Sequence, residues 1–152
     1  MSLHPITGKL LELCNGDAQA VRFIEDFWSF CVTWDDLIDR DKPFDNERIN
    51  NAMLWALFGL NDDPFYQRYP AVLRASIMQC IASWMTANKF EHSGQRDRIE
   101  QAYFLRCSPF DVFSTVVLLA SGFQKQLAAV EYLRTFAADD RLADYLTEHG
   151  EK

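Results

Sequence analysis

The stretch that decides the fold is VRFIEDFWSFCVTWDDLID, residues 21–39. Its apolar residues recur every three or four positions, which is the spacing of one face of an α-helix. They are Val21, Ile24, Trp28 and Cys31. The same face runs on through Asp35 and Asp39 at the carboxyl end of the segment. The pattern therefore predicts a long helix whose core-facing side ends in carboxylates.

The rest of the chain is also predicted to be helical. No segment alternates apolar and polar residues over the length of a strand, and prolines, glycines and asparagines separate the periodic segments. We predict a short helix over 5–13, the long helix capped by Asp17 and ending near Asp41, a helix over 46–60 capped by Asp45, helices starting at Pro70 and Gln95, and one or two final helices from Gln124 onward. The expected fold class is all-α, a single domain over residues 1–152 folded as a bundle of about six helices.

Two of these segments carry more specific expectations. The helix over 46–60 is expected to turn Ile49, Met53, Ala56 and Leu60 inward. The sequence Ser108-Pro109-Phe110-Asp111 fits either a capping box with proline in the first helical turn or a proline kink inside one long helix.

Charge and composition exclude several classes of protein. The formal net charge is −7 and no basic cluster is present, so neither nucleic acid nor an anionic membrane surface is an expected partner. The longest apolar stretch, 112–123, is interrupted by serine, threonine and glycine and is too short to span a bilayer. Aromatic residues make up 14% of the chain, which favours an aromatic core, an apolar pocket or a face buried in a homo-oligomer.

The cysteines and histidines do not form a recognisable zinc site. Cys14, Cys31, Cys80 and Cys107 are far apart in sequence, and so are the three histidines. Cysteines on predicted core faces behave as small apolar residues when reduced. Together with the lack of an export signal, this predicts a cytoplasmic protein with free thiols.

A second predicted helix ends in polar residues in the same way as the first. Its apolar stripe consists of Leu73, Ile77, Cys80, Ile81 and Trp84 and continues into Asn88 and Glu91. Carboxylates on a buried face are costly unless a cation or a proton compensates them. Asp35, Asp39 and Glu91 are therefore candidate ligands of Mg²⁺, which prefers oxygen atoms, and Asp36 and Asn88 are candidate auxiliary groups.

Arginines provide an alternative to a metal ion. Arg106 falls within a stripe formed by Ile99, Ala102, Phe110, Phe113 and Val117 if the helix continues through Pro109. It could neutralise the acids directly or contact a phosphate group beside a metal ion. The acids near residue 36 could also pair with Arg40, Lys42 or Arg48 at the helix end.

The segment Asp35-Asp36-Leu37-Ile38-Asp39, preceded by Phe30-Cys31-Val32-Thr33-Trp34, resembles the first aspartate-rich motif of isoprenoid synthases. In that all-helical family the motif binds Mg²⁺, which holds an isoprenoid diphosphate. The resemblance implies that Asp35 and Asp39 bind the metal and that Asp36 lies nearby. Asn88-Lys89-Phe90-Glu91 does not reproduce the second metal-binding motif of the family, and the chain is shorter than a synthase domain. The chain's overall character also resembles small helical proteins carried by bacteriophages.

Three functions follow from these patterns. The leading hypothesis is a Mg²⁺-dependent protein that binds a small diphosphate-bearing molecule, as an enzyme or as a degenerate relative of one, with Arg106 on the phosphate. The second is a non-enzymatic interaction or assembly protein with a buried acid–arginine network. The third is an all-helical nucleotide pyrophosphohydrolase, although its paired glutamates are absent.

Overall fold

The computed structural model describes residues 3–39, 45–137 and 142–150, and these residues form helices and no strands. The predicted all-α class is thus confirmed. The described residues contain seven helices of nine or more residues, so the predicted number of about six is wrong. This count leaves out the seven-residue helix Thr7–Leu13 and includes two helices between Gln95 and Gly122 and two after Gly122.

The N-terminal part agrees with its sequence signals. A 3-10 turn, η1 (His4–Ile6), leads into α1 (Thr7–Leu13), and the long helix α2 covers Ala18–Asp39. Asp17 caps α2, because its Oδ1 accepts hydrogen bonds from the backbone N–H groups of Gln19 and Ala20 at 3.0 and 3.1 Å. The predicted end near Asp41 lies outside the described residues.

The segment after residue 45 follows one helical path with a local change of pitch. Helix α3 (Asn46–Leu54) is followed by the π-helical turn η2 (Trp55–Gly59) and by α4 (Leu60–Asp62). Asp45 caps α3 by accepting a hydrogen bond from the Glu47 N–H at 2.9 Å. The prediction that Met53 faces inward is wrong, since Met53 is 44% exposed and the neighbouring Ala52 is the buried residue of α3.

The remaining helices form the main body of the molecule. After the short α5 (Pro64–Arg68) come α6 (Pro70–Glu91), α7 (Arg96–Arg106), α8 (Ser108–Ser121), α9 (Phe123–Ala137) and α10 (Leu142–Gly150). Helices α7 and α8 are separate helices divided at Cys107, and Pro109 lies in the first turn of α8, as the capping-box interpretation expects of the proline. Ser108 is not the cap, because it is the first residue of α8 and its hydroxyl donates to the Cys80 carbonyl at 3.3 Å.

The core is rich in aromatic side chains, as the composition suggested. Phe23, Phe27, Phe65 and Phe113 are almost completely buried, and Phe27 meets Phe113 edge to face with ring centroids 6.4 Å apart. Within the described chain, the stretch 96–121 is long and apolar enough to span a membrane by composition. Half of its most apolar window is buried inside the fold, as in the core helix of a folded domain.

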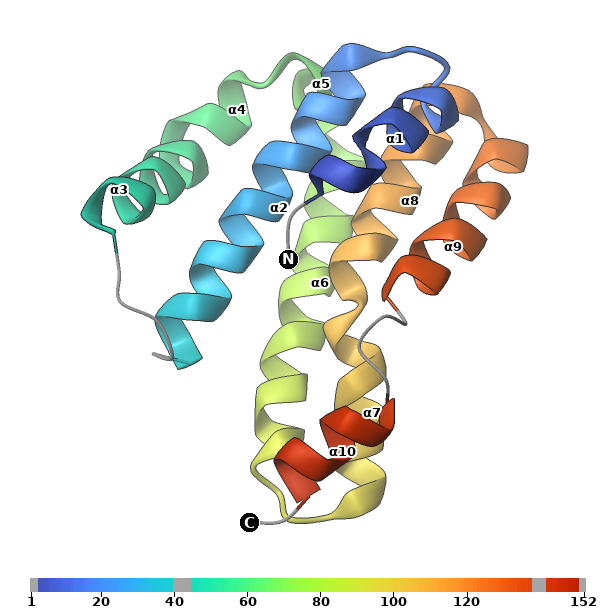
Figure 1. Cartoon of the computed structure of the whole chain (residues 1–152). Coiled ribbons are helices and arrows are strands. Elements are labelled where there is room, and N and C mark those ends of the chain that lie inside the picture. The colour runs from blue at the N-terminus through green and yellow to red at the C-terminus, as the bar shows by residue number, and fades with distance from the viewer. Residues whose placement is uncertain (1–2, 40–44, 138–141, 151–152) are drawn as a thin grey trace.

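Helix α6 is the central element of this arrangement (Figure 1). It packs against α7 and α8, and α8 packs in turn against α9. Helix α2 packs against α8 and reaches α6 near its carboxyl end, through Trp34 and Asp35, while α10 crosses α7 at the opposite end of the molecule. The carboxyl end of α2, the carboxyl end of α6 and the junction of α7 with α8 therefore surround one region, and the polar ends predicted from the sequence meet there.

Candidate ligand-binding site

Arg106 joins the two polar helix ends. Its Nε and Nη2 atoms donate to Oε1 and Oε2 of Glu91 at 2.8 and 2.7 Å, which is a bidentate ion pair between α7 and α6. Its Nη1 atom donates to Asp35 Oδ1 on α2 at 2.7 Å. The convergence of Asp35 and Glu91 on one spot was expected, and the structure places a guanidinium between them.

Glu91 is the most enclosed member of this group, with 4% of its side chain exposed. Burial alone would raise the pKa of Glu91, but the hydrogen bonds from Arg106 and Tyr145 and the charge of Arg106 lower it below the ordinary value of 4.5. The same contacts raise the pKa of Arg106, although burial acts in the opposite direction. Both groups are thus charged at neutral pH.

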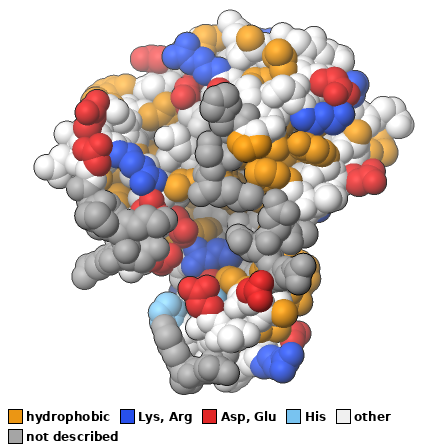
Figure 2. All heavy atoms as spheres, viewed as in Figure 1, with side chains coloured by type: hydrophobic (Ala, Val, Ile, Leu, Met, Phe, Trp, Pro, Cys, Tyr) orange, Lys and Arg blue, Asp and Glu red, His pale blue; other side chains and the backbone are white. Residues whose placement is uncertain are grey.

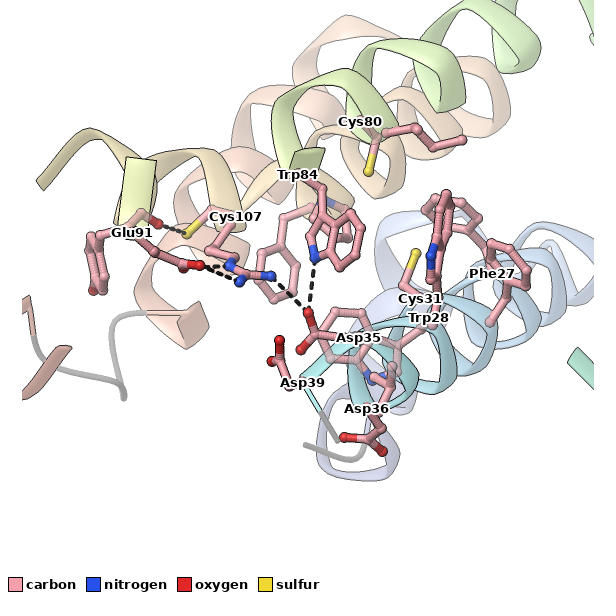
Figure 3. A pocket seen from close by; sticks show the side chains of 18 of the residues that line it. Phe27, Trp28, Cys31, Asp35, Asp36, Asp39, Cys80, Trp84, Glu91 and Cys107 are labelled. Carbon is pink, nitrogen blue, oxygen red and sulfur yellow. Dashed lines mark hydrogen bonds and ion pairs between the residues drawn. The ribbon is translucent and has the colours of Figure 1, made fainter. Parts of the chain in front are cut away.

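Trp84 supports the acid–arginine contact from α6. Its indole Nε1 donates to Asp35 Oδ1 at 2.9 Å, and the guanidinium carbon of Arg106 lies 5.5 Å from its ring centroid. Trp34 packs on Trp84 with centroids 5.2 Å apart. In Figure 3 the Asp35 carboxylate points toward Trp84, whereas Asp36 points away from it.

Asp36 belongs to a second ion pair. Its Oδ2 atom lies 2.7 Å from Nη1 of Arg48 on α3, and the Asp36 side chain is only 10% exposed. Arg48 Nε also donates to the Thr33 hydroxyl at 3.0 Å. Pairing of this acid with Arg48 was one of the alternatives considered from the sequence, whereas Arg40 and Lys42 lie outside the described residues.

Helix α10 closes one side of the group. The Tyr145 hydroxyl donates a short hydrogen bond to Glu91 Oε1, and the Tyr145 ring packs against Tyr103 and His149. Burial and the negative charge of Glu91 both raise the pKa of Tyr145, so this hydroxyl remains protonated and acts as a donor.

These side chains line a cavity of about 410 Å³. Its walls carry eight aromatic residues, which are Phe27, Trp28, Phe30, Trp34, Trp84, Tyr103, Phe110 and Tyr145. Cys31 and Cys80 also line it, and Figure 3 shows their sulfur atoms on the side of Trp84 away from Glu91. A volume of this size is in the range of pockets for small organic ligands.

The charged side chains of the cavity are mostly acidic. Its described lining includes five carboxylates, from Asp35, Asp36, Asp39, Glu91 and Glu148, and one guanidinium, from Arg106. Figure 2 shows acidic and basic side chains gathered in the recess between the wide upper part of the molecule and its narrower lower end. The cavity thus combines aromatic walls with an excess of negative charge.

The predicted metal ligands do not form a metal site in this arrangement. Asp35 and Glu91 meet, but both bond to Arg106, and Asp39 lines the same cavity. Asn88 is not among the lining residues; its buried Oδ1 accepts no hydrogen bond from the described atoms. No group of three or more His, Cys, Asp or Glu side chains within the described ranges could hold a metal ion.

The sequence analysis missed two residues of this site and underestimated a third. Tyr145 contacts Glu91 from 54 residues away, and Glu148 lies near it on α10. Their spacing on one helix face was visible in the sequence, but nothing indicated which surface that helix would cover. Trp84 was assigned to the core stripe, whereas its N–H group bonds to Asp35.

Comparisons with protein-family models, with curated proteins and with solved structures find no match for this chain. The function is therefore inferred from the geometry and chemistry of the cavity.

Proposed function

We propose that the protein binds a small organic cation in the aromatic cavity. The observation that carries the proposal is the composition of the lining, in which eight aromatic rings accompany five carboxylates and a single described guanidinium. Aromatic faces attract cations through their negative electrostatic potential, most strongly for tryptophan. Excess carboxylates add a Coulombic attraction that an anion or a neutral molecule would not experience.

Three of the five acids of the lining are paired with arginines, which favours a ligand with one ammonium group over a polyvalent cation. Arg106 pairs with Asp35 and Glu91, and Arg48 pairs with Asp36 from outside the lining. Glu148 on α10 is exposed and also lines the cavity. An ammonium group near Glu148, with its organic part against the tryptophans, satisfies both the charge and the aromatic surface.

A Mg²⁺-bound diphosphate is the second candidate, favoured by the meeting of Asp35 and Glu91 from two separate helices. Metal binding would require these carboxylates to leave Arg106, which could then contact a phosphate oxygen. The described residues do not fit a metal ion in their present positions. The function implied by the isoprenoid-synthase resemblance, and the Mg²⁺ cofactor, thus stay predictions.

A thermal-unfolding series separates these candidates. Phenethylamine and benzyltrimethylammonium should raise the midpoint of unfolding, because a ligand that binds only the folded state stabilises it. Phenethyl alcohol and hydrocinnamate, which present similar rings without the positive charge, should raise it much less. Stabilisation by the alcohol or by hydrocinnamate equal to that by the amine would refute the proposal. Stabilisation by Mg²⁺ with pyrophosphate, and by no amine, would establish the second candidate instead.

A variant of the lining tests where the cation binds. Glu148→Gln should weaken amine binding roughly fivefold, the effect of ~1 kcal/mol for one charge pair at ~4 Å in water. The matched control is Asp62→Asn, an exposed acid on α4 that does not line the cavity. Calorimetric titration measures the three affinities, and an equal loss in the control would mean that only overall charge matters.

A further inference from the structure

The outer face of α6 is an exposed apolar stripe. Ala71, Ala75, Met78, Ala82 and Met85 are all solvent-exposed, with Met78 at 61% and Met85 at 51%. They are separated alternately by four and three residues, which is the spacing of the seam of a coiled coil. At about 100° per residue, the stripe lies opposite the core face of the helix. That core face includes the buried Leu73, Cys80 and Ala87.

Helix α6 carries few charges for a helix with an exposed face. Of the 21 residues before Glu91 only Arg74 and Lys89 are charged, and its uncharged polar residues Ser76, Gln79, Ser83 and Thr86 lie to one side of the stripe. An outer face that stays in water normally carries polar and charged residues in place of such a stripe. The described helices pack on α6 from α5, α7 and α8, and from the carboxyl end of α2 near Trp84, and they leave the stripe exposed.

We propose that this face pairs with the same face of a second copy of the chain, with the two α6 helices antiparallel. The stripe is self-complementary about a two-fold axis that passes beside Cys80. In this register Met78 lies opposite Ala82 of the second copy, and Ala75 lies opposite its Met85. Each long methionine then fills the space above a small alanine, so the two helices approach closely along the whole stripe.

Side-chain size and charge select the antiparallel arrangement over the parallel one. A parallel pair in register would place Met78 against Met78 and Ala82 against Ala82. Two large side chains would then crowd one level of the interface, and two small ones would leave a gap at the next. It would also bring Arg74 beside Arg74 and Lys89 beside Lys89. The antiparallel register places Arg74 near Thr86 of the second copy and Lys89 near its Ala71, so the like charges are separated.

Light scattering after size-exclusion chromatography provides the first test. The wild-type chain should have the mass of a dimer, and Ala82→Arg should have the mass of a monomer because it introduces two cations at the centre of the pairing. The matched control, Ala128→Arg, changes an exposed alanine on α9 and should remain dimeric. Circular dichroism should show full helical content in both variants. A monomeric wild-type chain at millimolar concentration would overturn the proposal, as would a dimer that survives Ala82→Arg.

Cross-linking tests the register. A mixture of Met78→Cys chains with Ala82→Cys chains should form a disulfide-linked dimer of the two variants under mild oxidation. Each variant alone should cross-link much less, because residue 78 does not lie opposite residue 78 of the second copy. Cross-linking of Met78→Cys to itself in preference to the mixture would refute the antiparallel arrangement. The unmodified chain, which keeps its four native cysteines, is the control for unrelated disulfides.

Discussion

The Arg106 side chain connects three helices through charged hydrogen bonds. It belongs to α7, binds Glu91 on α6 through two atoms and binds Asp35 on α2 through a third. Arg106 is 21% exposed and Glu91 only 4%, so water screens the pair weakly. Removing one partner from such a pair is costly because the other charge stays buried without compensation.

Glu91→Gln tests the contribution of this pair. Glutamine keeps the size of the side chain but removes the charge that faces Arg106. We expect the free energy of unfolding to fall by about 3 kcal/mol, as measured by urea denaturation. Glu100→Gln is the control, since Glu100 forms an exposed pair with Arg96 within α7 and should lose at most about 0.5 kcal/mol. Equal losses in the two variants would show that the Arg106 contacts do not stabilise the fold.

The same carboxylate predicts a dependence of stability on pH. The pKa of Glu91 is lower in the folded chain than its ordinary value of 4.5, so the unfolded chain binds this proton first as the pH falls. The stabilisation is complete above pH 4.5 and is lost as the pH drops through the lower pKa of the folded state. The difference in unfolding free energy between wild type and Glu91→Gln should therefore shrink on acidification. A constant difference between neutral pH and pH 3, roughly one and a half units below that ordinary pKa, would contradict this linkage.

At the scale of single elements, α2 shows how a helix tolerates acids at both ends. Asp17 at the amino end interacts favourably with the helix dipole and caps the first turn. Asp35 and Asp36 lie in the last turns, where the dipole disfavours negative charge. Arg106 and Arg48, from α7 and α3, compensate them.

Asp17→Ala tests the cap. The variant loses the acceptor for two backbone N–H groups, and we expect the free energy of unfolding to fall by ~1–2 kcal/mol. Asp17→Asn separates this effect from the ion pair with Arg68, because asparagine keeps an acceptor oxygen and loses only the charge. The asparagine variant should stay within ~1 kcal/mol of wild type, the usual limit for an exposed pair. Urea denaturation of the two variants gives the comparison, and similar losses in both would assign the effect to Arg68.

Some features of individual helices could be predicted from local sequence patterns alone. The long helix, its cap at Asp17 and the cap at Asp45 depend on neighbouring residues, so spacing and side-chain chemistry predicted them. The orientation of Met53 depends on which face of α3 packs against α2. The sequence pattern predicted the wrong face, because Met53 is exposed. The role of Ser108 was decided by the nearby Cys80 carbonyl on α6.

At the scale of the whole molecule, the two proposed surfaces occupy opposite sides of α6. Cys80, Trp84 and Glu91 line the cavity from the core face of the helix, whereas Met78 and Met85 lie on the outer face. Pairing of two chains through the outer face would thus leave each cavity separate, with residues of α10 lining one side of it. Ligand binding and dimerisation can be tested independently, because Glu148→Gln and Ala82→Arg alter different faces.

The amino-acid sequence by itself determined the all-helical class, the long helix, the caps at Asp17 and Asp45 and the line of acids at the ends of two core faces. These features depend on spacing within one helix, which the chain specifies locally. Only the tertiary structure decided the partners of those acids. Asp35 and Arg106 are 71 residues apart, and Tyr145 reaches Glu91 from the C-terminal helix. Such contacts depend on the angles at which helices pack, and these angles result from the fit of many side chains across the core.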